Sequence, residues 1–206
     1  MKVYVEDRLW EEYAVWRQED QIGTAKWVGS AQSLFDEEVS GLLDGGNKHL
    51  AKLDNGGFEV VMVGNVTKMS KSDVSLADTY IDRADGNKTK EFSPENIMAQ
   101  TFAFQEAVFN LPPALKREVN LRILFMKSEN NEGKIEEHCI CDQHPTFQYG
   151  CIAVQSTNSH YKFPDSTLFA HELGHTLGYG EHDDNYYKDN STLEGQLYMW
   201  SEVGFG

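Results

Sequence analysis

The sequence predicts a single domain of the α/β class. Short β-prone runs alternate along the chain with longer segments in which apolar residues recur at the helical period. The chain has 206 residues, a length that suits one substantial core. It contains no internal repeat, no low-complexity tract and no clear linker. We therefore expect one domain covering residues 1–206.

Four segments are expected to form strands. Residues 2–6 alternate apolar and polar side chains, and residues 58–64 are an apolar run after an Asn-Gly-Gly turn. Two further β-prone runs cover 121–126 and 150–155. The polar stretch 65–93 is expected to be a long surface connection.

Helical periodicity and capping residues predict four helices. The first covers 7–16, and the second covers 27–43 and is expected to stop at the following Asp-Gly-Gly. The third begins with Ser-Pro and ends before Pro-Pro, over 93–111. The fourth begins with Asp165 or Ser166 as its cap.

The charge of the chain argues against nucleic acid as a partner. There are 18 basic and 33 acidic residues, which gives a net charge of −15. Such a field repels phosphate backbones. We interpret the acidic surface mainly as a solubility feature, although basic substrates or Ca²⁺ would also be attracted to it. No apolar run approaches the roughly 20 residues that a membrane span requires.

The most informative segment is a His-Glu-Leu-Gly-His motif. On a helix, residues four apart lie on one face, about 6 Å apart along the axis, so His171 and His175 can bind the same metal ion. Glu172 follows the first histidine and can take a proton from water. Gly178 permits a sharp helix exit that returns His182 to the ion. Three nitrogen ligands plus water form the open, catalytic type of zinc site.

These residues resemble the metzincin superfamily, whose pattern is HExxHxxGxxH followed by a methionine-containing turn. The likeness is strongest to the reprolysin group, which contains the ADAM and venom metalloproteases. Asp183 after the third histidine and the order of strands and helices are also similar. Met199, in Leu-Tyr-Met-Trp, resembles the methionine beneath the metal.

The resemblance implies a zincin-like fold. Such a fold has a twisted, mostly parallel sheet of four to five strands with an antiparallel edge strand, packed by helices. A small C-terminal subdomain follows the active-site helix. In this chain the upper subdomain is expected over about residues 1–178 and the lower, short one over about 179–206.

The resemblance further implies a zinc-dependent endopeptidase that acts on proteins or peptides. One catalytic Zn²⁺ would be held by His171, His175 and His182, and water would be activated by the ion and Glu172. Substrate is expected to lie along the edge of a strand made by Gly150, Cys151, Ile152, Ala153 and Val154.

Two departures from the family pattern are present. The family spacing puts the third ligand at 181, where this chain has Glu181, and the histidine comes one residue later. An inserted glycine, Gly180, can absorb the extra residue, and nitrogen ligation suits zinc, so we favour His182. The chain also ends seven residues after Met199, where reprolysins continue with a pocket wall, a closing helix and a further cysteine.

The cysteines and sequons favour a secreted protein. The three cysteines are Cys139, Cys141 and Cys151, and the three Asn-X-Thr sequons are at Asn65, Asn87 and Asn190. The Cys-Asp at 141 resembles that of reprolysins, whose cysteine pairs with another one near the carboxy terminus. That partner would be absent here, so Cys139–Cys151 is the expected disulfide. Cys141–Cys151 is the alternative.

Secretion as a venom or salivary protease follows from the resemblance. It implies that a signal peptide and any propeptide lie outside this chain, which begins with a β-prone run instead of an apolar signal segment. A cytosolic location is the alternative.

Several other interpretations stay open. A second zinc site could use His138, Cys139, Cys141 and His144. Ca²⁺ could bind near Glu6 or Asp183-Asp184, although a solvated acidic face is the simpler interpretation. His49 and His160 are expected at the surface, and Trp10, Trp16 and Trp27 in the core.

Two other functions also fit the sequence. The first is a catalytically weak or inactive metzincin-like binding module, which the short carboxy terminus and the displaced histidine favour. The presence of Glu172 argues against it, because a dead enzyme needs no base there. The second is a cytosolic zinc hydrolase of another family, with Glu181 as a ligand.

Overall fold

The structure, a computed structural model, is described here for residues 1–19, 26–51, 59–69, 103–129, 148–156, 161–163, 165–167, 169, 170 and 173. Its labelled helices and strands are, in order, β1 (Lys2–Glu6), α1 (Asp7–Gln18), α2 (Ala31–Leu50), β2 (Thr67–Met69), α5 (Pro113–Lys116), β3 (Leu121–Glu129), β4 (Gln148–Ser156) and β5 (Tyr161–Lys162). A further helix covers 103–109, and another begins at 166. No helix within these described ranges combines the length and apolarity needed to cross a bilayer.

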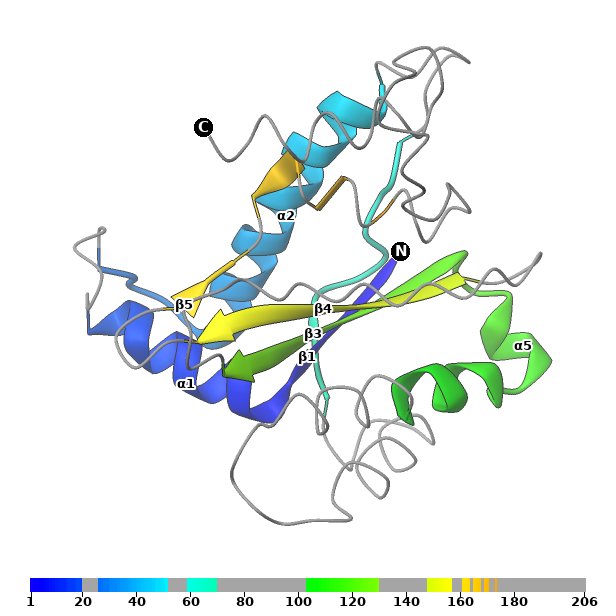
Figure 1. Cartoon of the computed structure of the whole chain (residues 1–206), viewed down its shortest axis with the longest axis horizontal. Helices are drawn as coiled ribbons and strands as arrows, with labels where there is room; N and C mark the ends of the chain where they lie inside the picture. The colour runs from blue at the N-terminus through cyan, green and yellow to red at the C-terminus, as the bar shows by residue number, and fades with distance from the viewer. Residues whose placement is uncertain are drawn as a thin grey trace, which may run out of the picture.

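The strands form one mixed sheet in the order β2-β1-β3-β4-β5. The first four run parallel, and β5 pairs antiparallel with the end of β4. Parallel strands require long crossover connections. The connection from β1 to β2 and the connection from β2 to β3 both contain helices (Figure 1). The α/β class, the parallel strands and the antiparallel strand at one side of the sheet agree with expectation.

Apolar side chains of successive strand residues lie on opposite faces of the sheet, and each face carries helices. Val3 and Val5 of β1 contact the core that contains α1 and α2, whereas Tyr4 between them contacts the core around the 103–109 helix. Strand β3 alternates in the same way, with Phe125 in the first core and Leu124 in the second. Figure 1 shows α2 on one side of the sheet and α5 on the other.

Helix α2 is longer than the sequence indicates, which corrects the predicted stop at 44–46. Ser30 caps its start by accepting a hydrogen bond from the Ser33 backbone N–H at 3.1 Å. The helix then continues through Gly45 and Gly46 to Leu50, which is fully buried. A glycine inside a helix costs about 1 kcal/mol relative to alanine, so here the core contacts of the last turn outweigh that penalty.

The predicted strand at 58–64 is wrong for its described part. Residues 59–63 form no strand of the sheet, and β2 comes later in the chain. The side chain of Asn47 satisfies the backbone of Val60, with its amide N–H donating to the carbonyl at 2.8 Å and its oxygen accepting from the amide at 2.9 Å. An α2 side chain therefore provides the hydrogen bonds that a neighbouring strand would otherwise supply.

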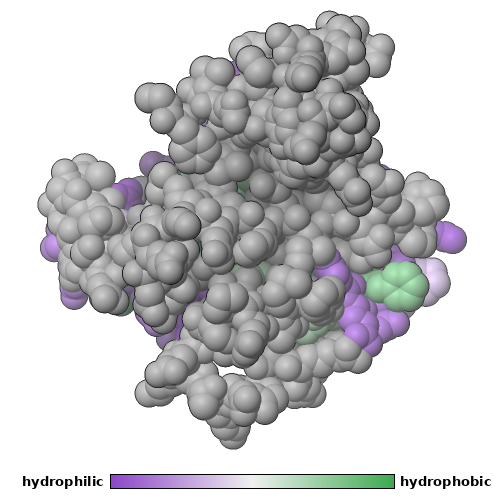
Figure 2. Space-filling view, viewed as in Figure 1, coloured by the Kyte–Doolittle hydropathy of each residue, from purple (hydrophilic) through white to green (hydrophobic). Residues whose placement is uncertain are grey.

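The helix over 103–109 confirms the end of the third predicted helix but not its whole apolar face. Phe104 and Val108 are fully buried, whereas Phe109 is 53% exposed and lies beneath the ammonium group of Lys116 at 4.9 Å. Pro113 then opens α5. In Figure 2 an apolar group on this side of the molecule is bordered by hydrophilic surface. The earlier part of the predicted helix lies outside the described residues.

Candidate functional site

Most of the predicted metal site lies outside the described residues. This holds for the three histidines, His171, His175 and His182, and for Glu172 and Met199. What the structure describes is the first part of the helix that would carry two of these histidines.

The helix begins where the sequence predicts. Asp165 accepts a hydrogen bond from the Thr167 backbone N–H through its carboxylate at 2.8 Å, and its carbonyl accepts from Phe169 N–H at 2.9 Å. This is N-terminal capping, which supplies an acceptor for amide groups that have no partner inside the helix. Of the two predicted caps, Asp165 is the one used.

One stripe of this helix is buried in the core of α1 and α2. Phe169 and Ala170 are fully buried and Leu173 is 1% exposed. The ring of Phe169 stacks with that of Phe125 in β3 at a centroid distance of 6.2 Å. Phe125 in turn stacks with Phe163, 5.8 Å away. The helix is thus attached to the central strand of the sheet by aromatic contacts.

The aromatic cluster continues into α1 and α2. Tyr13 contacts Phe163 at 4.8 Å and Phe35 at 5.5 Å between ring centroids. Its hydroxyl donates to the Glu38 carboxylate at 2.5 Å. Trp16 is buried in this core, and Trp10 and Trp27 are partly buried against it. The three tryptophans are therefore core residues, as expected.

Helix α2 crosses the start of this helix at two adjacent glycines. A β-carbon built on Gly45 would lie 2.2 Å from Ser166 Cβ, which is far inside contact distance. One built on Gly46 would lie 3.4 Å from Phe169 Cδ1. Nearby, the His49 Nε2 atom lies 3.4 Å from the Thr167 hydroxyl. His49 therefore lies at a helix crossing instead of on an open surface.

Sequence reasoning missed this crossing because it interpreted the Gly-Gly pair as a helix stop. A usable signal was present. The helical spacing continues past the glycines from Leu43 to Leu50, which is two turns further on, and both leucines are buried. A glycine pair inside an intact helical period indicates close approach of another backbone.

The predicted substrate strand is present as β4. Its residues Gly150, Cys151, Ile152, Ala153 and Val154 pair in parallel with β3, from Ile123 to Lys127. On its other side β4 pairs with β5 at Gln155 and Ser156. Within the described ranges no strand pairs with that side over 150–154. Cys139 and the side chain of Cys151 lie outside what the structure describes, so their disulfide stays a prediction.

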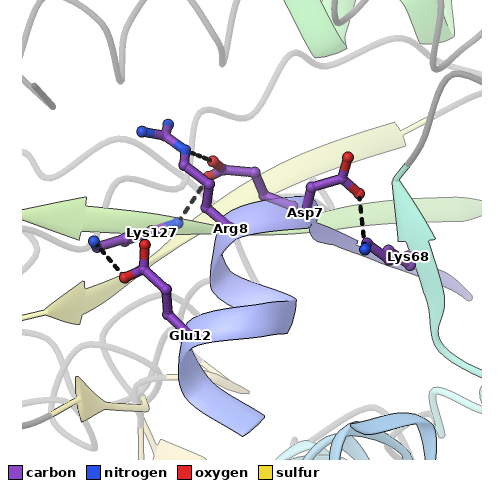
Figure 3. A network of polar contacts seen from close by, with 6 residues as sticks. Asp7, Arg8, Glu12, Lys68 and Lys127 are labelled. Atoms are coloured by element: carbon purple, nitrogen blue, oxygen red, sulfur yellow. Dashed lines mark hydrogen bonds and ion pairs between the residues drawn. The ribbon is translucent and has the colours of Figure 1, made fainter. Parts of the chain in front are cut away.

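A second polar cluster lies where β1, β2 and β3 end (Figure 3). Glu6, 6% exposed, accepts from Arg8 Nε at 2.8 Å and from the Lys127 backbone N–H at 3.1 Å. The Lys127 ammonium donates to Glu12 at 2.6 Å, and Lys68 pairs with the carboxylate of Asp7 at 3.9 Å. Figure 3 shows these groups arranged around the first two turns of α1.

Glu6 is a structural group and not part of a solvated acidic face, which corrects that expectation. Burial raises the pKa of its carboxyl above the ordinary value, and Arg8 and Lys127 lower it in part. Both carboxylate oxygens already accept protein donors. The other residues suggested for Ca²⁺, Asp183 and Asp184, lie outside the described residues, as do His138, Cys141 and His144.

In the part of the chain that the structure describes, no group of three His, Cys, Asp or Glu side chains is arranged to hold a metal ion. No model of a known protein family matches the chain, and no curated protein is significantly similar to it.

Proposed function

We propose that this chain is a zinc-dependent endopeptidase of the metzincin kind, with a zincin-like fold. The observation that carries the proposal is the capped helix that starts at Asp165 and buries Phe169, Ala170 and Leu173. This is the helix on which the sequence places the His-Glu-Leu-Gly-His motif.

The helical period supports the choice of ligands. Each residue advances about 100° around a helix. On a helix that keeps this period, positions 171 and 175 would fall about 150° or more from the centre of the buried stripe. Core packing therefore does not compete for the two histidines. Had His171 or His175 shared the angular position of Phe169, burial as a core residue would have been the better interpretation.

The donor set also suits zinc. Imidazole nitrogens are ordinary Zn²⁺ ligands, and three of them leave one position for water or substrate. His171 and His175 would come from the helix, and His182 from the chain after Gly178. When bound, zinc supplies Lewis acidity that polarises a scissile carbonyl and lowers the pKa of coordinated water.

The residues of the chain would divide the remaining work. Glu172 takes a proton from the attacking water and passes it to the leaving amine. The outer side of β4, over Gly150–Val154, offers backbone donors and acceptors to which an extended peptide can add as a strand. Protein and peptide substrates follow from this mode of binding. We also propose the Cys139–Cys151 disulfide, and secretion as the setting in which it forms.

The test uses the whole chain loaded with one equivalent of zinc and casein as substrate. Wild type should cleave casein, and a chelator should stop it. Glu172→Gln should retain zinc and lose cleavage, whereas Glu37→Gln, at an exposed position of α2, should cleave like wild type. If Glu172→Gln cleaves at the wild-type rate, the proposed mechanism is wrong. If wild type binds zinc but never cleaves, the inactive binding module becomes the better assignment.

A further inference from the structure

At two adjacent glycines, α2 packs closely against the helix on which the sequence places the histidine motif. Gly45 faces Ser166, and Gly46 faces Phe169, with the Ala170 side chain 3.9 Å from the position of a Gly46 β-carbon. A third glycine, Gly41, lies one turn earlier on α2, and a β-carbon there would meet nothing within 4 Å. The same helix thus contains contacting glycines and a non-contacting one.

A side chain at 45 cannot be accommodated by rotation of a flexible group. The atom it would strike is Ser166 Cβ, which is attached directly to the backbone, at 2.2 Å. Carbon atoms in contact lie about 3.5–4.0 Å apart, so the helices would have to separate by more than about 1 Å. Phe169 opposes such movement because it is fully buried and stacks with Phe125.

We propose that Gly45 and Gly46 are positioning residues that set the depth of the motif helix relative to the sheet. This inference rests on the proposed function. The sequence places His171 and His175 on one helix, so a rigid displacement of that helix would keep them aligned with each other. The same displacement would move both histidines relative to His182 and to β4, which belong to other segments of the chain. Gly45 thus controls whether ligands from different segments converge.

The experiment compares four variants of the whole chain: Gly45→Ala, Gly46→Ala, Gly41→Ala and the double variant Gly45→Ala/Ser166→Gly. The double variant moves the β-carbon from one helix to the other and removes the clash. Zinc affinity is measured by competition with a chelator, and ligand geometry by the visible absorption of the cobalt-substituted protein. Casein cleavage and the melting temperature of the zinc-free chain are recorded for each.

Gly45→Ala should weaken zinc binding by about tenfold or more, the usual effect of disturbing groups that orient ligands, and should alter the cobalt spectrum. Gly46→Ala should have a smaller effect, because its β-carbon would lie 3.4 Å from the nearest atom. Gly41→Ala should bind zinc like wild type. The double variant should recover zinc affinity and the wild-type spectrum.

The outcomes separate this inference from the proposed function. Wild type that binds no zinc overturns both. Wild type that binds and cleaves, together with Gly45→Ala that behaves like Gly41→Ala, overturns this inference alone. A lower melting temperature in Gly45→Ala with unchanged zinc affinity and cobalt spectrum would show a role in stability only, which also contradicts it. If Gly45→Ala does not fold, the comparison of Gly46→Ala with Gly41→Ala decides.

Discussion

The rings of Phe125 and Phe169 lie 6.2 Å apart between centroids, with their planes inclined by 22°. Phe125 belongs to β3 in the middle of the sheet, and Phe169 to the helix on which the sequence predicts the histidine motif. Both side chains are fully buried. This stack links the proposed metal-binding helix to the centre of the fold.

Phe169→Ala should therefore lower the free energy of unfolding by about 3–5 kcal/mol, through lost burial and the cavity left behind. Phe109→Ala is the matched control, because Phe109 is 53% exposed. Its loss should cost no more than about 1 kcal/mol, including the contact with Lys116. Urea denaturation of the zinc-free chain measures both changes. Equal effects would contradict the buried position of Phe169.

His182→Ala should reduce zinc affinity by about tenfold or more, whereas Glu181→Ala should leave it near the wild-type value. The reason is that an imidazole suits zinc and Gly180 absorbs the extra residue before it. Chelator competition on both variants provides the measurement. The reverse result would assign the third ligand to Glu181 and favour another zinc-hydrolase family.

Glu6 should contribute more to the stability of the fold at acidic pH than at neutral pH, whereas a carboxyl group with a lowered pKa does the reverse. Its pKa is raised by burial, so the folded chain holds this proton more tightly than the unfolded chain. The contribution of Glu6 is therefore fully present below the ordinary value of 4.5 and is lost as pH rises through the raised folded pKa.

The matched variant for this prediction is Glu6→Gln, which does not titrate. The free energy of unfolding of wild type minus that of Glu6→Gln should increase as the pH is lowered from neutral towards 4.5. Urea titrations at a series of pH values provide the data. A difference that decreases over this range would mean that the ion pair with Arg8, together with the backbone hydrogen bond and the positive charge of Lys127, lowers the pKa of Glu6 by more than burial raises it.

Asn65 should be glycosylated when the chain is produced in a eukaryotic secretory host. It is exposed, and it follows Gly64, whose φ of +75° is a turn conformation that glycine adopts readily. Asn65→Gln and Thr67→Ala should each remove one glycan, seen as a mass difference. Asn110→Gln, outside any sequon, should remove none. An unmodified Asn65 in secreted wild type would contradict the prediction.

The sequence predicted the elements whose signals are local. The strand at residues 2–6, the helix start at Asp165 and the helix end before the proline pair are each predicted from neighbouring residues, and each is found as expected. The motif likewise belongs to the sequence, because a helix of any tertiary context places residues four apart on one face.

Other features depended on partners distant in the chain. The Gly45-Gly46 pair is a stop signal locally but becomes a contact surface because Ser166 and Phe169 pack there. The apolar run after residue 58 has strand character locally, but Asn47 binds its backbone outside the sheet.

The sequence by itself determined the parallel-sheet class, the start of the motif helix and the residue types available to a metal. Only the tertiary structure decided that α2 continues to Leu50 and that its glycines contact the motif helix. It also decided that Glu6 is buried between Arg8 and Lys127. The physical reason is that capping and periodicity are energies between neighbours along the chain, whereas close backbone approach and charge burial arise only between segments brought together by folding.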